Sequence, residues 1–198
     1  WTITEALENV DPLVLRYTLI NAPYRQPVDF NQVMIDDSQT HHNRLCACYG
    51  EGLSKHGTGG WGEIPELVNA TKRFEEGMND DFNTRVALVE VQAVAKWLRG
   101  NLNSGGSEEE IAGAVGWISE YAGDVLGLLP TTEEVLARME SNDGVRDRVA
   151  PRVESLIAER EGAREAKDWE RADEIRDELA GMGVIVEDGP NGATWRIE

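Results

Sequence analysis

The sequence predicts a mainly α protein, in which an antiparallel helical bundle is followed by a small α+β domain of two helices and a β-hairpin. Three observations support this fold class. Apolar residues recur at helical spacing over most of the chain, and polar capping residues precede several of these segments. Strand-like alternation occurs near the end, on both sides of Gly189-Pro190-Asn191-Gly192. A length of 198 residues suits one large domain or two small ones.

Helix-start signals dominate the first quarter of the chain. The run Thr2-Ile3-Thr4-Glu5 has the spacing of a capping box, and Asp11-Pro12 places an N-cap before a first-turn proline. Asn31 is a plausible cap for a helix expected from about 32 to 49. Residues 50–62 are rich in glycine and are expected to form a loop.

The same pattern continues to the end of the predicted bundle. Helical periodicity resumes at Ile64, and Asn79-Asp80-Asp81-Phe82-Asn83-Thr84 interrupts it and caps the next helix. The run Ser107-Glu108-Glu109-Glu110 is a second capping box, for a helix that reaches about Leu126. Pro130 is expected to close this segment.

The last third of the chain predicts a linker and then two further helices. A short helix near 133–139 and a linker at Ser141-Asn142-Asp143-Gly144 precede a helix of about five turns that begins at Val145. Asp168 is expected to cap the second helix, and Gly183 suits its left-handed stop. The core face of that helix is expected to contain Trp169, Ala172, Ile175 and Leu179.

The chain is strongly acidic. It has 37 Asp and Glu residues against 19 Lys and Arg residues, a net charge of −18, and only four lysines. Such acidity argues against broad affinity for nucleic-acid phosphates. Scarce lysine with excess acid is typical of halophilic archaea, where concentrated salt screens surface charge, and an acidic mesophilic protein is the alternative. No membrane span and no export signal is found, so a cytoplasmic location is expected.

Two histidines and two cysteines lie close together in the predicted helix from 32 to 49. His42 and Cys46 are four residues apart, so one helical face could present both to a metal ion. Zinc needs more ligands, and Cys48 points away from Cys46, so ordinary helix residues with reduced thiols are the favoured interpretation. The role of these residues and of the neighbouring His41 stays open.

No catalytic centre is predicted in this chain. Asp80 and Asp81 could form a carboxylate pair, but acids at a helix start more often act as caps. Gly57, Gly59 and Gly60 lack the lysine-serine and strand context of a phosphate loop. No GxSxG, HExxH or paired CxxC motif is present, so no catalytic residue, metal ligand or cofactor is expected here.

Basic residues are concentrated near the C-terminus: Arg160, Arg164, Lys167, Arg171 and Arg176. Two tryptophans and three aspartates lie among or just after them: Trp169, Trp195, Asp168, Asp173 and Asp188. Arginine can bind phosphate or stack on a base, and carboxylates accept hydrogen bonds from the amino groups of guanine and cytosine. This mixture is typical of proteins that read single-stranded RNA loops. A solvated acidic face with both tryptophans in the core is the alternative.

Three motifs resemble cysteinyl-tRNA synthetases of the bacterial type. The first, Tyr24-Arg25-x-Pro27-Val28-Asp29-Phe30, is similar to the entry of that family's helical bundle. The second, Met78-x-Asp80-Asp81-Phe82-Asn83-Thr84, resembles the signature of the bundle itself. The third resembles the family's C-terminus: Arg164-x-x-Lys167-Asp168-Trp169-x-x-Ala172-Asp173-x-x-Arg176-Asp177, followed by Glu187-Asp188-Gly189-Pro190-x-Gly192-x-Thr194-Trp195-Arg196. Arg85 departs from the pattern, because proline is common at that position.

The resemblance implies a division of the chain into four parts. Residues 1–27 would be a stem-contact region, 28–130 the helical bundle that supports the tRNA, 131–142 a linker with a short helix, and 143–198 the anticodon-binding domain. The family's catalytic domain, with its HIGH and KMSKS motifs and zinc-binding cysteines, would precede this chain. ATP and zinc are therefore expected there, and this chain alone is expected to be inactive.

The resemblance also assigns anticodon contacts to Arg164, Trp169, Asp173 and Asp188. The anticodon of cysteine tRNA is GCA, whose guanine and cytosine carry amino donors for carboxylates, and tryptophan offers a stacking face. The expected partner is cysteine-specific tRNA, with no membrane and as a monomer. A free-standing tRNA-binding accessory protein, or a helical protein-interaction module without an RNA role, is the alternative.

Overall fold

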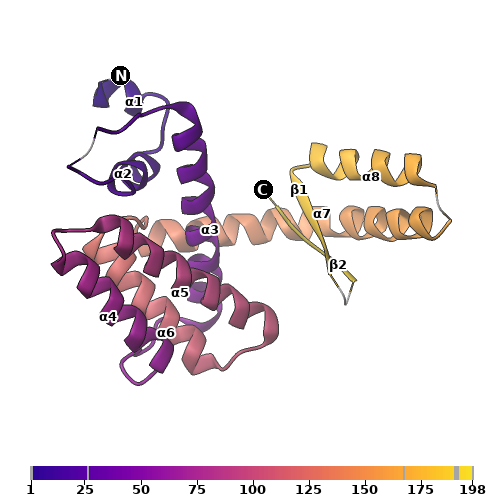
Figure 1. Ribbon diagram of the computed structural model, residues 1–198. Coiled ribbons are helices and arrows are strands. Elements are labelled where there is room, and N and C mark those ends of the chain that lie inside the picture. The colour runs from indigo at the N-terminus through magenta and orange to yellow at the C-terminus, as the bar shows by residue number, and fades with distance from the viewer. Residues whose placement is uncertain (1, 26, 167, 190–191, 198) are drawn as a thin grey trace. The chain divides into compact units, whose positions relative to one another are not determined.

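The computed structural model describes residues 2–25, 27–166, 168–189 and 192–197, without the side chains of 140–148, 165, 187–189, 192, 194, 196 and 197. The chain is mainly helical, as predicted, and divides into two compact units, Trp1–Leu136 and Ala137–Glu198 (Figure 1). In the part of the chain that the structure describes, no helix has both the length and the apolar character needed to cross a membrane.

The first unit consists of helices joined by turns and two longer loops. They are α1 (Ile3–Leu7), α2 (Pro12–Ile20), α3 (Gln32–His56), α4 (Pro65–Asn79), α5 (Thr84–Ser104), α6 (Glu108–Ile118), the π-helix η1 (Ser119–Val125) and the first residues of α7 (Thr132–Glu165). Three of the predicted caps are confirmed here. Thr2 with Glu5 and Ser107 with Glu110 form capping boxes, and the side chain of Asn31 accepts a hydrogen bond at the start of α3.

Helices α3 to α6 enclose the core of this unit, and Figure 1 shows α4, α5 and α6 packed side by side. Leu98 and Trp117 are completely buried in it. The Trp117 ring stacks on Tyr121 at 4.6 Å between centroids, and its Nε1 donates to Oγ1 of Thr71 at 2.8 Å. A buried indole N–H is therefore satisfied, and α6 and η1 are fixed against α4.

The glycine-rich segment expected to be a loop is helical in its first part. Helix α3 continues to His56, past the expected end at 49, and Gly50 and Gly52 are buried in it. A Cβ atom at Gly52 would lie only 2.6 Å from Cγ2 of Val115. Glycine at this position lets α3 approach α6 closely instead of ending the helix. The loop begins at Gly57, whose φ is +69°.

The linker expected at 141–144 is also helical. Helix α7 runs without interruption from Thr132 to Glu165, so the prediction of a short helix, a linker and a second helix is wrong. These four residues have weak helix propensity, at a cost of roughly 0.5–1 kcal/mol each, but none lacks a backbone N–H. A continuous helix keeps the backbone hydrogen bonds that a linker would give up. The roles expected for 1–27 and 28–130 stay predictions.

The second unit contains the rest of α7, helix α8 (Trp169–Gly181) and the strands β1 (Val184–Gly189) and β2 (Gly192–Ile197). The strands form the predicted antiparallel hairpin, with Val184 opposite Ile197 and Gly189 opposite Gly192. Gly183, with φ +70°, follows α8 as expected. The buried core of the unit joins α7, α8 and β1 through Val153, Leu156, Ile175, Leu179 and Val184.

Candidate nucleic-acid interface

Helix α8 has one buried face and one exposed face. Ala172, Ile175 and Leu179 are buried, as predicted. Trp169 is 60% exposed, so its predicted place in the core is wrong. The apolar residues of α7 that pack on α8 end at Ile157, and charged residues dominate α7 beyond that point. Among the described residues, the apolar core of the unit therefore does not extend to the first turn of α8, and the indole ring of Trp169 stays open to solvent.

Trp169 and Asp173 lie one helical turn apart on α8, so their side chains are neighbours on its surface. The Asp173 side chain is 68% exposed, and its Oδ1 lies 3.4 Å from Nη1 of Arg176. An exposed ion pair of this kind contributes little to stability. The carboxylate can therefore exchange Arg176 for the amino group of a base without a large cost.

The other two residues predicted to bind the anticodon lie on α7 and β1. Arg164 is exposed on the last turn of α7. The backbone N–H of Asp168 donates to the carbonyl of Ala163 at 2.9 Å, so the turn between the helices keeps Arg164 at the same end of the pair as Trp169. Asp188 lies on β1 opposite Ala193, and its side chain is outside the described residues.

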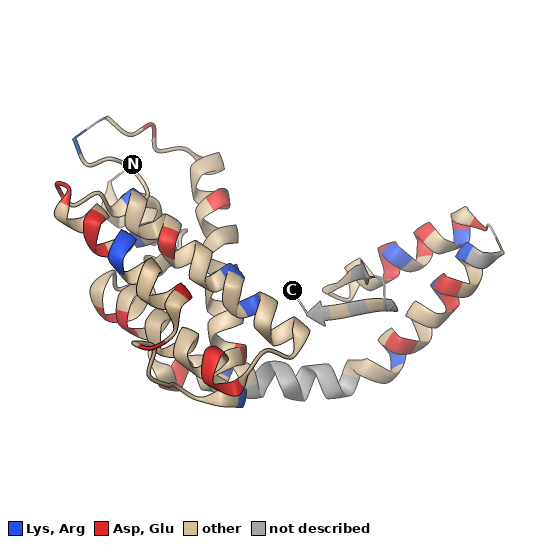
Figure 2. Ribbon diagram, turned by 60° about the horizontal axis from the view of Figure 1, so that its bottom comes forward, with Lys and Arg blue, Asp and Glu red and all other residues tan. Residues whose placement is uncertain are grey.

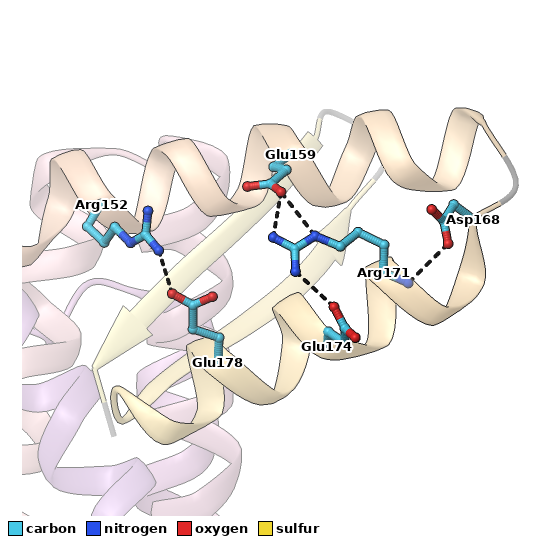
Figure 3. Close-up of polar contacts among 6 residues, drawn as sticks. All are labelled: Arg152, Glu159, Asp168, Arg171, Glu174 and Glu178. Carbon is cyan, nitrogen blue, oxygen red and sulfur yellow. Dashed lines mark hydrogen bonds and ion pairs between the residues drawn. The ribbon is translucent and has the colours of Figure 1, made fainter.

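Arg171, one of the basic residues concentrated near the C-terminus, is bound to carboxylates within the unit (Figure 3). Its Nη2 and Nε atoms donate to Oε1 of Glu159 on α7 at 2.6 and 3.1 Å. Its Nη1 donates to Glu174 at 2.8 Å, and its backbone N–H donates to the capping side chain of Asp168 at 3.2 Å. The hydrogen bonds with Glu159 and then Glu174 raise the pKa of Arg171 above its usual range. Arg171 thus joins α7 to the turn of α8 that carries Trp169.

A second ion pair joins the same two helices. Nη2 of Arg152 lies 2.6 Å from Oε1 of Glu178, and Figure 3 shows this pair beside the Arg171 network. In Figure 2 the basic positions of α7 and α8 alternate with acidic ones. Lys167 lies outside the described residues. The concentration of basic charge seen in the sequence is therefore offset locally by carboxylates. Ion pairs between residues twelve or more positions apart, such as Glu159 and Arg171, cannot be predicted from the local spacing of charges in the sequence.

The histidine and cysteine group of α3 makes bundle contacts. His42 is buried, and its Nε2 lies 2.8 Å from the carbonyl oxygen of Leu128, a distance at which the ring N–H donates. Cys46 Sγ lies 3.6 Å from the same nitrogen. Burial raises the pKa of the Cys48 thiol to about 12, which keeps it protonated and unreactive. Among the described residues, no group of three or more His, Cys, Asp or Glu side chains could hold a metal ion.

The predicted capping role of Asp81 is wrong. Helix α5 is capped by Asn83, whose side chain accepts from the backbone N–H of Val86. Oδ1 of Asp81 instead accepts hydrogen bonds from the Tyr24 hydroxyl and from Nη2 of Arg25, each at 2.8 Å. The first two motifs of the sequence analysis are thus in direct contact.

Comparison with family models identifies the kinds of domain in this chain. Residues 146–196 match the cysteinyl-tRNA ligase anticodon binding domain, and residues 73–130 match the DALR domain. The chain therefore carries an anticodon-binding domain of the cysteinyl-tRNA ligase type, and the exposed face of α8 lies within it.

Whole-chain comparisons agree. The chain is 36% identical over 196 residues to the cysteine–tRNA ligase of Laribacter hongkongensis, covering 99% of this chain and 40% of that protein. It is 37% identical over 199 residues to that of Thioalkalivibrio sulfidiphilus, covering 99% and 40%, and 34% identical over 211 residues to that of Geobacter metallireducens, covering 100% and 44%. The chain spans about two fifths of the length of these relatives and is homologous to the C-terminal part of cysteine–tRNA ligases, as predicted.

Proposed function

We propose that this chain is the tRNA-binding part of a cysteine–tRNA ligase and reads the GCA anticodon of cysteine tRNA. The observation that carries this proposal is the exposed face of α8, where Trp169 and Asp173 lie one turn apart inside a matched anticodon-binding domain. A solvent-exposed indole contributes little to a core, but it offers a stacking face to an unpaired base.

Each residue has a separable role in this proposal. Trp169 stacks on a base, and such a stack is worth roughly 1–3 kcal/mol. Asp173 and Asp188 accept hydrogen bonds from the amino groups of guanine or cytosine, and a wrong base that leaves such a contact unmade costs about 1–3 kcal/mol. Arg164 binds a phosphate or a base edge. Because the chain has a net charge of −18, phosphate contacts alone would bind tRNA weakly.

In the intact enzyme, this domain would select the tRNA while other residues activate cysteine with ATP and transfer it to the tRNA. ATP and zinc would serve that catalytic part, outside the present sequence. Selection would appear as a higher kcat/KM for the correct tRNA. We further propose that the enzyme is monomeric and acts in the cytoplasm. A HIGH motif in the parent reading frame would separate this enzyme from a free-standing accessory protein.

The sharpest test compares two aspartates of α8 in the full chain. Asp173→Ala should weaken binding of cysteine tRNA with a GCA anticodon by about 5- to 100-fold and leave a tRNA with a changed anticodon almost unaffected. The control is Asp177→Ala, which removes a carboxylate 3.9 Å from Nε of Arg176 on the same helix and should leave both affinities unchanged. Filter binding measures both. An equal loss on the two tRNAs would refute base reading by Asp173.

We also propose that the protein is adapted to concentrated salt. The net charge of −18 and the four lysines support this, because self-repulsion of an acidic surface is relieved as salt screens it. The free energy of unfolding should rise from roughly 0.1 M to roughly 1 M KCl. The substitutions Asp36→Asn and Asp37→Asn, both at exposed positions, should reduce that rise in stability without changing which anticodon is bound. A stability that falls with KCl would contradict the proposal.

A further inference from the structure

Two segments that lie far apart in the sequence meet in the first unit. One is Tyr24-Arg25, in the turn after α2, and the other is the turn between α4 and α5 that contains Asp81 and Phe82. Asp81 accepts hydrogen bonds from both Tyr24 and Arg25 at 2.8 Å, and Nε of Arg25 donates to the Tyr24 hydroxyl at 3.0 Å. Nearby, Oγ1 of Thr84 donates to the carbonyl of Ile20 at 2.6 Å. The two turns are therefore held together by hydrogen bonds.

The backbone of the second turn is strained. Asp81 and Phe82 have φ values of +58° and +53°, in the left-handed region that favours glycine. Phe82 is nevertheless a large aromatic residue and is 69% exposed. Burial does not explain a phenylalanine here, and backbone preference opposes it. Strained positions of this kind cluster at binding sites, where they hold a side chain in a fixed place.

The described residues use only part of the hydrogen-bonding capacity of Arg25. Its guanidinium lies 5.4 Å from the centre of the Tyr24 ring, and its side chain is 69% exposed. Nε donates to Tyr24 and Nη2 to Asp81, while no described residue accepts a hydrogen bond from Nη1. An exposed ion pair adds little stability, so the effect of Asp81 is to orient the guanidinium. The open donors suit a phosphate, which arginine binds in a planar, paired geometry.

We propose that Tyr24, Arg25 and Phe82 form a second RNA contact, which binds an unpaired nucleotide of the tRNA outside the anticodon. Phe82 stacks on the base, and Arg25 binds the adjoining phosphate with Tyr24 supporting its guanidinium. An aromatic face beside an oriented arginine is the combination by which proteins hold unpaired nucleotides. This inference rests on the proposed function for the identity of the RNA.

Replacing Phe82 by glycine separates binding from folding. Because glycine adopts positive φ without strain, Phe82→Gly should keep or raise the temperature of unfolding. It should weaken binding of full-length cysteine tRNA by at least about fivefold, the effect of one lost stack, and leave binding of the isolated anticodon stem-loop RNA unchanged. The matched control is Val33→Ala, at an apolar position on α3 that is 71% exposed, which should change neither affinity.

Arg25→Gln tests the phosphate contact. It should reduce the slope of log K against log salt by about 0.7–0.9 for full-length tRNA, because one phosphate contact is lost, and leave the slope for the stem-loop unchanged. Unchanged tRNA affinity in Phe82→Gly would overturn the inference. An equal loss on the stem-loop would overturn it too, as would a wild-type chain that binds no tRNA. If wild type binds GCA and changed-anticodon tRNAs equally while Phe82→Gly still weakens both, the anticodon proposal fails and this inference stands.

Discussion

Each of the two units is stabilised internally in a different way. The first unit has a large buried core of aromatic and aliphatic side chains from α3 to α6, and glycine at 52 allows a close approach of α3 to α6. The second unit has a small buried core, and the side chains of Arg171 and Arg152 tie α8 to α7 at the surface. Packing therefore positions the bundle, whereas charged contacts orient the helix that carries the candidate anticodon residues.

This difference has a consequence for function. A helix held by one buried face and by ion pairs at its sides keeps its remaining face open, and Trp169 and Asp173 lie on that face. In the first unit the exposed aromatic, Phe82, is instead held by its backbone and by the hydrogen-bonded turns around it. Both units thus have an exposed aromatic side chain. Trp169 is positioned by the packing and ion pairs of its helix, whereas Phe82 is positioned by its backbone and the hydrogen-bonded turns.

The largest effect is expected where the bundle is most tightly packed. Gly52→Ala should lower the free energy of unfolding by about 1–3 kcal/mol, because the new Cβ would lie 2.6 Å from Cγ2 of the buried Val115. Gly100→Ala is the control, since a Cβ on this exposed turn of α5 meets nothing within 4 Å. It should raise stability by roughly 0.5–1 kcal/mol, as alanine is the better helix former. Denaturant unfolding measures both. If both substitutions changed the free energy of unfolding in the same direction, close packing at Gly52 would not be what limits the stability of the bundle.

A smaller effect is expected in the second unit, and it should depend on salt. Arg171→Gln should lower the local stability of α8 slightly at low salt and by less at high salt, because its ion pairs are partly exposed and screened. Amide hydrogen exchange of α8 measures this, with α5 of the first unit as an internal reference. Arg176→Gln is the matched control and should have a weaker effect, since its pairs are longer, at 3.4 and 3.9 Å. Faster exchange in α5 as well would show that the effect is not confined to the second unit.

Local chemistry made several features predictable. Capping boxes at Thr2 and Ser107 and the glycine stop at 183 depend on a few neighbouring residues, so their spacing was enough. The buried positions Ile175 and Leu179 followed from helical periodicity. Helical periodicity did not predict the exposure of Trp169, because a buried face and an exposed binding face of a helix have the same residue spacing. Only the charged character of the facing end of α7 separates them.

By itself, the sequence determined the mainly helical class, the ends of many helices, the hairpin and the motifs shared with cysteine–tRNA ligases, because each depends on short runs of residues. The tertiary structure decided what depends on partners distant in sequence. It placed the glycines of α3 inside a helix, bound Arg171 to Glu159, and brought Tyr24 and Arg25 to Asp81. A glycine or a charge has the same local preferences in a loop, a close helix contact or an ion pair, and only the packed neighbour selects among them.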